Sequence, residues 1–364
     1  MRKIQGFSRG MGFGGWLTNY KRFNVLPQAW RGPLTIGDME HFASYITEAD
    51  VKNVKEMGLD HVRVGFDQVV LEEAPYVYRE TIFVLLDNFV SWCKKYGLNV
   101  VFNLHKAVGN YCDIEETEKL LDNEELQQRF IALWLKIEER FHTEEGVMFE
   151  LLNELRDVDA APWNALVKKT IERIRKVNPT RRIIVGGTHW NDPDHLKDIA
   201  VYDDENVFYT FHNYAPNEFT HQRGVLQAPQ CYYNRVMHYP SDIEPYRDYQ
   251  RTVFNAKNPY ANRERMDKQF LYRSMQGAKD FIDAHPDKIL WCGEFGTIRH
   301  ADMQSRENWM RDMISICKEY DIPYCVWNYL STPNDGNRFS LVDDETRKIL
   351  SPALLSIIQG NVEE

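Results

Sequence analysis

Two glutamates stand at the ends of short apolar runs, far apart along the 364-residue chain. Glu154 closes VMFELLNE, and Glu294 lies in KILWCGEF. Retaining cleavage of a glycosidic bond needs a carboxylic acid that protonates the leaving oxygen and a carboxylate that attacks the anomeric carbon, held about 5 Å apart. We therefore expect Glu154 to act as general acid and base and Glu294 as nucleophile, provided that the fold brings them together.

Further polar and aromatic side chains fall at the ends of other apolar runs. Arg63 and Tyr214 are expected to keep Glu294 ionised through charge and hydrogen bonds. Glu154 is expected in a less polar wall that keeps it protonated. Asn153, beside the acid, is expected to bind the sugar 2-hydroxyl. The other candidates for binding the substrate are rings, with Trp327 as the floor of a sugar subsite: Trp16, His105, Trp190, His212 and Trp327.

Each of these residues also has a purely structural interpretation. The two glutamates could be solvated carboxylates at strand ends, and Arg63 could be a structural ion-pair partner. Both histidines and Tyr214 could be satisfied polar groups of the core. The tryptophans could pack in the core, which for Trp16 is as good an alternative as substrate binding.

Other site chemistries lack their motifs in this sequence. The chain has no HExxH, no Cys/His quartet and no EF-hand spacing, so no metal is expected. Its early glycines are not followed by GK[ST], and the GxSxG nucleophile elbow is absent. We expect no cofactor.

These side chains need a scaffold, and the hydrophobic pattern predicts one. Eight β-rich runs alternate with stretches of helical period, which is the plan of a (β/α)8 TIM barrel. The expected strands are Met11–Trp16, His61–Phe66, Val100–His105, Val147–Leu151, Arg182–Gly187, Val207–His212, Ile289–Glu294 and Pro323–Trp327. The expected helices include Glu48–Met57, Thr81–Tyr96, Glu124–Phe141, Pro162–Val177, Arg306–Tyr320 and Arg347–Gln359.

One stretch breaks this rhythm. Asn213–Arg265 contains five prolines and no sustained apolar period, so we expect a long insertion after the sixth strand, over the active-site face. A shorter excursion, Thr18–Tyr45, follows the first strand. No Ser/Gly linker or low-complexity tract occurs, and residues 1–364 are expected to form a single catalytic domain.

The composition limits the classes of molecule that the protein could bind. A net charge of −10 without a Lys/Arg cluster argues against nucleic acid and anionic membranes and suits a neutral substrate. The first 30 residues lack a signal-peptide pattern, so we expect a cytoplasmic protein, or a secreted one whose leader is not part of this sequence. The six cysteines lie far apart and are expected to be free thiols. We expect a monomer.

The combination of motifs resembles glycoside hydrolase family 5 of clan A. Asn-Glu at strand four, Gly-Glu-Phe-Gly at Gly293–Gly296, Arg63, the His-x-Tyr of His212 and Tyr214, and Trp327 occur in the family's order, from about Gly12 to Gln359. Within the family, GGWLTNY, FELLNE and WCGEFG are most similar to the single-domain clostridial endoglucanase C type. The resemblance implies a metal-free retaining hydrolase of β-1,4-glucan or mixed-linkage β-glucan.

Three positions depart from the family pattern. Lys106 stands where a second histidine is common, Gly65 replaces the proline of Arg-x-Pro, and Asn103 replaces an aspartate. Lys106 places a cation near the non-reducing subsites, so these motifs do not decide which sugar the site prefers. A β-mannanase or glucomannanase and an exo-acting β-glucosidase are the alternatives within the enzyme class. A sugar-binding barrel without activity is the alternative outside it, and the intact glutamate pair disfavours it.

Overall fold

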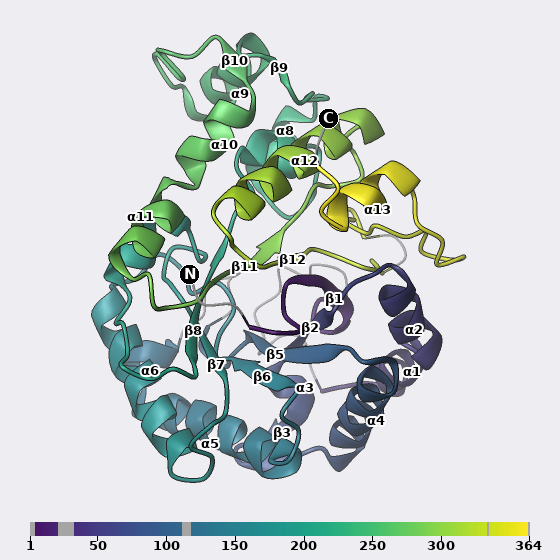
Figure 1. The fold of residues 1–364 in the computed structure, drawn as a ribbon, viewed down its shortest axis with the longest axis vertical. Helices are drawn as coiled ribbons and strands as arrows, with labels where there is room; N and C mark the ends of the chain where they lie inside the picture. Colours follow the sequence, from purple (N-terminus) through teal and green to yellow (C-terminus); the bar gives the residue numbers. More distant parts are fainter. Residues whose placement is uncertain (1–3, 21–32, 111–117, 333–334, 363–364) are drawn as a thin grey trace.

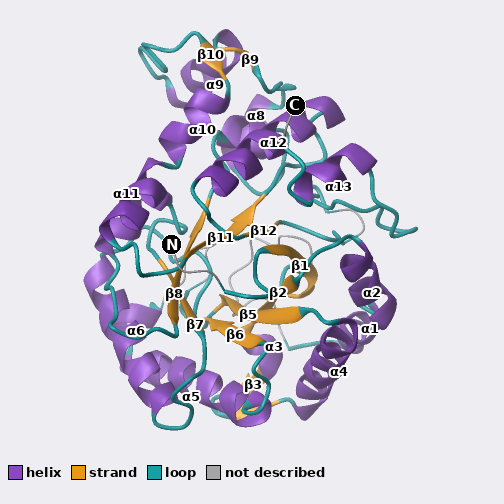
Figure 2. Ribbon diagram, in the orientation of Figure 1, coloured by secondary structure: helices purple, strands orange, loops and turns teal. Residues whose placement is uncertain are grey.

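A closed barrel of eight parallel strands forms the centre of the molecule. The structure, a computed structural model, describes residues 4–20, 33–110, 118–332 and 335–362. The barrel order is β1-β12-β11-β8-β7-β6-β5-β2, with the helices arranged around it (Figure 1, Figure 2). The strands are β1 (Arg9–Leu17), β2 (His61–Asp67), β5 (Asn99–Lys106), β6 (Val147–Glu150), β7 (Ile183–Gly186), β8 (Val207–His212), β11 (Leu290–Phe295) and β12 (Tyr324–Val326). The predicted (β/α)8 barrel is confirmed.

The barrel interior changes from apolar to polar along its axis. Alternate residues of a strand share one face, so every second side chain points inward. One inner layer is apolar and contains Val101, Met148 and Phe208 among others. Two residues further along the same three strands stand buried polar side chains: Asn103, Glu150 and Thr210. The interior therefore becomes polar toward the carboxyl ends of the strands, where barrels of this kind hold their active sites.

Helices cover the barrel wall. They are α1 (Ile36–Ser44), α2 (Glu48–Glu56), α3 (Gln68–Leu71), α4 (Glu80–Tyr96), α5 (Glu124–Phe141), α6 (Ala160–Arg175), α12 (Met303–Glu319) and α13 (Pro352–Ile358), with 3-10 turns η2 (Leu120–Asp122) and η3 (Pro193–Asp198) and a hairpin of β3 (Glu72–Ala74) and β4 (Val77–Tyr78). Helix α5 has the predicted bounds, but α13 begins five residues later than predicted. Residues 343–350 form a turn instead, in which Asp343 Oδ1 accepts two backbone N–H groups, and Ser351 then caps the helix.

The segment between β8 and β11 contains more regular structure than its sequence pattern suggested. It holds α7 (Asn217–Thr220), α8 (Ala228–Tyr233), β9 (Ser241–Asp242), α9 (Glu244–Phe254), β10 (Arg265–Met266), α10 (Lys268–Ser274) and α11 (Gln276–Ala284). Helix α9 forms because Tyr246 and Tyr249 bury one face of it, although the rest is polar. In Figure 1, α9, β9 and β10 lie at the periphery, beyond α10. That the insertion covers the active-site face stays a prediction.

Five of the cysteines are described and all five are free thiols, while Cys112 lies outside the described part. Within the described ranges, no helix combines the length and the apolar character that a bilayer span requires. The excursion predicted at 18–45 is described only in part, and that part includes α1.

Candidate active site

Arg63 makes the central contacts of a buried polar network at the mouth of the barrel, which is the end where the carboxyl ends of the strands lie. It points inward from β2 and is fully buried. Its Nε and Nη2 donate to both oxygens of Glu150, at 2.6 and 2.9 Å. Nη1 donates to Glu294 Oε2 at 2.7 Å, and Nη2 donates to Asn153 Oδ1 at 2.7 Å. Burial lowers the pKa of Arg63, but the carboxylates of Glu150 and Glu294 outweigh it and raise the pKa overall.

Glu294 reaches the interior through an irregularity of β11. The register of β11 against β8 shifts between Cys292 and Glu294, so Glu294 departs from the simple alternation of the strand. The preceding Gly293 permits the close approach, because a Cβ there would lie 2.4 Å from Thr210 Oγ1. In this position Glu294 Oε1 accepts a 2.6 Å hydrogen bond from the hydroxyl of Tyr214.

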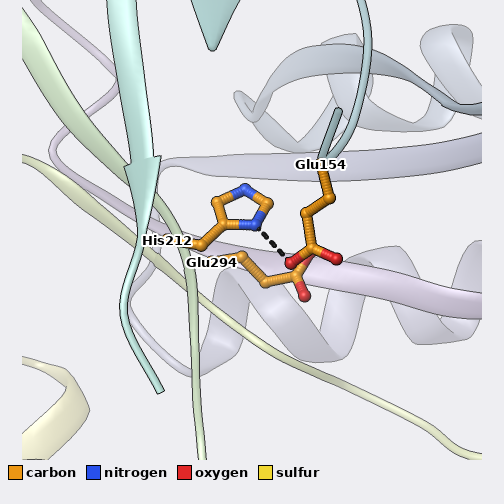
Figure 3. Close-up of side chains that lie close together, drawn as sticks. All are labelled: Glu154, His212 and Glu294. Carbon is orange, nitrogen blue, oxygen red and sulfur yellow. Dashed lines mark hydrogen bonds and ion pairs between the residues drawn. The ribbon is translucent and has the colours of Figure 1, made fainter. Parts of the chain in front are cut away.

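Glu154 lies just beyond β6, and Figure 3 shows its carboxyl group next to the side chains of His212 and Glu294. Its backbone adopts φ 37°, a left-handed conformation that non-glycine residues rarely take. Its Oε1 is 2.8 Å from Nδ1 of His212, which ends β8. Ligand-type atoms of Glu154, His212 and Glu294 all lie within 4.8 Å of one another. This closeness of the two carboxyl groups matches the spacing of retaining glycosidases and excludes the wider spacing of inverting ones.

Burial dominates the electrostatics of this cluster. It raises the pKa of the Glu294 carboxyl, with the nearby Glu154 acting in the same direction, against the opposing effects of His212, Arg63 and the Tyr214 hydrogen bond. The two expected contacts of Glu294 are therefore present, but they do not outweigh its burial. Burial also lowers the pKa of His212 to about 4, so this ring is neutral near pH 7. Carboxyl groups this close to one another are coupled in their titration.

Trp327 and His105 form a stacked pair at the mouth. Their ring centroids are 5.5 Å apart and the planes differ by 10°. His105 Nδ1 lies 2.9 Å from Asn103 Oδ1, and burial lowers the pKa of His105 well below its usual value. Trp327 belongs to a buried cluster with Ile298 and Phe339, and Tyr214 packs against this cluster. Because Tyr214 also donates to Glu294, the cluster adjoins the glutamate pair.

The other two tryptophans lie elsewhere. Trp16 is 1% exposed, and its indole N–H donates to the carbonyl of Phe42 at 2.7 Å, which places it in the core beneath α1. Trp190 is 43% exposed and follows β7. Its backbone N–H donates to the carbonyl of Leu155 at 2.8 Å, so it is attached to the loop that carries Glu154.

The departures from the family pattern have structural correlates. A Cβ at Gly65 would lie 2.8 Å from Thr18 Cγ2 and 3.1 Å from His105 Nδ1, so the glycine leaves room for both neighbours. Lys106 is buried at the end of β5, and its charge contributes to the lowered pKa of His105. Asn103 Nδ2 is buried without a hydrogen-bond partner among the described residues.

Two members of the network, Glu150 and Asn191, were not among the residues predicted from the sequence. Glu150 is fully buried and binds Arg63, and Asn191 places its Nδ2 3.4 Å from His212 Nε2. A charged residue inside the apolar run VMFE was a readable signal for Glu150, because an unpaired buried carboxylate is too costly to be accidental. Asn191 is the last of three consecutive left-handed residues, a run that has no signature in the sequence.

The chain resembles known proteins over almost its whole length. Residues 27–332 match the family described as Cellulase (glycosyl hydrolase family 5). Endoglucanase C of Acetivibrio thermocellus is 34% identical over 97% of this chain and 98% of that protein. Cellodextrinase A of Ruminococcus flavefaciens is 28% identical over 88% of this chain and 85% of that protein. Endoglucanase Cel5A of Thermotoga maritima shares the fold, with a TM-score of 0.73, 23% identity and 97% coverage of both chains. The chain belongs to glycoside hydrolase family 5.

Proposed function

We propose that the chain is a retaining endo-β-1,4-glucanase that hydrolyses cellulosic or mixed-linkage β-glucan by double displacement. The observation that carries this proposal is the convergence of Glu154 and Glu294 within 4.8 Å at the polar end of the barrel. The family supports glycoside hydrolysis, and the name of the 34% identical relative supports an endoglucanase in particular.

Glu294 is the proposed nucleophile. It accepts hydrogen bonds from a guanidinium and from a phenol, and both favour its ionised form over its protonated form. The catalytic proton is therefore assigned to Glu154. This assignment rests on the guanidinium and the phenol that donate to Glu294, and it agrees with the requirement that a nucleophile be ionised while the acid is not.

In the first step, a carboxylate oxygen of Glu294 bonds to the anomeric carbon as the bond from that carbon to the leaving oxygen breaks. Glu154 transfers its proton to the leaving oxygen, and the result is a glycosyl ester on Glu294. In the second step, the now ionised Glu154 takes a proton from water while the water oxygen attacks the anomeric carbon. The ester bond breaks, and both carboxyl groups return to their starting states.

The substrate is bound by the surrounding polar and aromatic groups. Asn153 is the proposed partner of the sugar 2-hydroxyl, and its Oδ1 is held by Arg63. Trp327, supported by His105, is the proposed floor of the subsite next to the scissile bond. Trp190 is a proposed stacking platform on the leaving-group side, since it is attached to the loop of the acid. We assign no substrate contact to the buried Trp16.

A substrate panel tests the proposal. Purified protein is incubated with carboxymethylcellulose, mixed-linkage β-glucan, glucomannan and cello-oligosaccharides, and reducing ends, viscosity and product size are followed together. An endoglucanase lowers viscosity while few reducing ends have formed, because it cuts within chains. Release of glucose alone would show an exo-acting β-glucosidase, faster cleavage of glucomannan would show a mannanase, and no new reducing ends would leave only sugar binding.

We further propose that the protein acts as a monomer on polysaccharide, without cofactor, nucleic acid or membrane partner. Sedimentation analysis of the active protein checks the oligomeric state, with a single species near 43.0 kDa expected. A dimer as the only active species would contradict it. Whether the protein works inside or outside the cell is addressed by assaying activity in culture fluid and cell extract.

A further inference from the structure

Glu150 is a fully buried carboxylate that the reaction scheme does not use. It lies inside the barrel on β6, four residues before Glu154, with no exposed surface. Both of its oxygens accept hydrogen bonds from Arg63, at 2.6 and 2.9 Å. This paired geometry fixes the plane of the guanidinium. The remaining donors of Arg63 are thereby directed at Glu294 and Asn153.

Glu150 also determines how much positive charge acts on the nucleophile. One guanidinium faces two carboxylates, Glu150 and Glu294, and the charge of Glu150 offsets its attraction for Glu294. Among the residues that the structure describes, the other titratable groups facing Glu150 are His212 of β8 and Cys325 of β12. Burial keeps both of these neutral near pH 7, since it lowers the pKa of His212 and raises that of Cys325.

The third contact of Glu150 concerns the histidine that faces the acid. Glu150 Oε1 lies 4.0 Å from His212 Nε2, and a nearby negative charge favours a proton on that nitrogen. Asn191 Nδ2 is 3.4 Å from the same nitrogen, while its own Oδ1 is buried without a partner. Turning the Asn191 amide by half a turn lets Oδ1 accept a hydrogen bond from Nε2–H and gives this buried oxygen a partner. With the proton on Nε2, Nδ1 carries a lone pair directed at Glu154.

We propose that Glu150 is a positioning residue for catalysis: it orients Arg63, sets the charge that acts on Glu294, and holds the proton of His212 on Nε2 so that Nδ1 accepts a hydrogen bond from the carboxylic acid of Glu154. The inference rests on the proposed roles of Glu154 and Glu294. Its consequence is that one buried carboxylate adjusts both catalytic glutamates at once, through different neighbours.

The first test is the pH profile of kcat/KM for Glu150→Gln. Removing a negative charge lowers the pKa of both neighbouring carboxyl groups, so both the acidic and the basic limb are expected to move to lower pH, with a maximal rate about 10- to 100-fold lower. Glu150→Asp keeps the charge and should lower the rate while leaving the limbs near their wild-type positions. Limbs of Glu150→Gln that coincide with the wild-type limbs would overturn the proposal.

Glu138 supplies a matched control. It is also a buried glutamate in contact with an arginine, since Arg181 Nε lies 2.5 Å from Glu138 Oε2, but it belongs to α5, outside the barrel. Glu138→Gln is expected to lower the melting temperature without moving either limb. If the limbs moved equally in both variants, the loss of any buried ion pair would explain the change in the pH profile of kcat/KM. The position of Glu150 beside Arg63 and His212 would then not be its cause.

A second test does not depend on activity. In wild-type protein labelled with 15N at histidine, the chemical shift of each His212 ring nitrogen shows whether that nitrogen carries a proton. Comparison with His212→Gln assigns the signals. The proposal predicts protonated Nε2 and unprotonated Nδ1 near pH 7, and protonated Nδ1 would overturn it. Because this readout is independent of turnover, it separates failure of the inference from failure of the proposed substrate.

Discussion

Arg63 Nη1 lies 2.7 Å from Glu294 Oε2, although 231 residues separate the two along the chain. The contact joins β2 to β11, which are not neighbours in the barrel order, so it exists only because the sheet closes. A buried charge pair of this kind is costly unless its geometry is good, and here all the described contacts of the guanidinium are with carboxyl or amide oxygens.

Arg63→Lys should lower kcat by about 100-fold or more while changing KM little. A single ammonium group cannot donate to Glu150, Glu294 and Asn153 at once, as the planar guanidinium does. Steady-state kinetics on cello-oligosaccharides measure this. Arg140→Lys is the control, since Arg140 pairs with Asp87 at a partly exposed position outside the site. An unchanged kcat in Arg63→Lys would mean that Arg63 supports the fold and not the reaction.

Glu154→Gln and Glu294→Gln should each lower hydrolysis of polymer by about 100- to 10,000-fold. The two should differ on an aryl cellobioside whose leaving group needs no protonation: Glu154→Gln should still form the glycosyl ester quickly, whereas Glu294→Gln should not. Burst kinetics of phenolate release show the difference. The exposed Glu139 offers a neutral comparison in Glu139→Gln. Near wild-type hydrolysis of polymer by either active-site variant would remove the basis of the assignment.

The stability of the fold should depend on pH through His212. Its folded pKa is lowered to about 4 from 6.5, so between these values the unfolded chain binds a proton that the folded chain does not. Stability contributed by the neutral ring is thus present above pH 6.5 and is lost as pH falls toward 4. Between pH 6.5 and 4.5, wild type should lose about 2 kcal/mol more unfolding free energy than His212→Gln. Urea titrations at the two pH values measure the unfolding free energy of each protein. If wild type and His212→Gln lost the same unfolding free energy between these pH values, the prediction would be contradicted.

Trp327 and Trp16 should respond to substitution in opposite ways. Trp327→Ala should lower kcat/KM by about tenfold or more, because it removes the ring stacked on His105 at the mouth. Trp16→Phe should lower the melting temperature with little effect on kcat/KM, because Trp16 is core. Kinetics and thermal unfolding of both variants provide the comparison. A larger catalytic loss in Trp16→Phe than in Trp327→Ala would reverse these assignments.

Removal of metal should leave activity unchanged. The convergent atoms of Glu154, His212 and Glu294 are close enough to hold an ion, but the adjacent guanidinium of Arg63 opposes a divalent cation there. Assays before and after dialysis against a chelator test this. Activity that disappears and returns only with an added divalent ion would show that the cluster is a metal site.

The sequence predicted the barrel well because hydrophobic period and strand length report directly on burial. The strand Val207–His212 and the helix Glu124–Phe141 have the bounds that their patterns indicate. The pairing of Glu154 with Glu294 was also predictable, since closure of a parallel barrel brings all strand ends to one face. Family resemblance then narrowed the chemistry.

Other features depend on contacts that a linear pattern does not contain. The inward turn of Glu294 results from a register shift in β11, and Trp16 is core because α1 supplies the carbonyl of Phe42. The order of α9 comes from two buried tyrosines in an otherwise polar segment. The balance of burial against hydrogen bonding at Glu294 likewise requires coordinates, because burial is a property of the assembled barrel.

The configuration of the first-formed product tests the central claim most directly. Proton NMR during early hydrolysis of a soluble β-glucan or cello-oligosaccharide distinguishes the anomers before they equilibrate. Two carboxyl groups within 4.8 Å predict the β-anomer first, because two displacements restore the configuration. Appearance of the α-anomer first would show a single displacement by water and would contradict the roles proposed for Glu154 and Glu294.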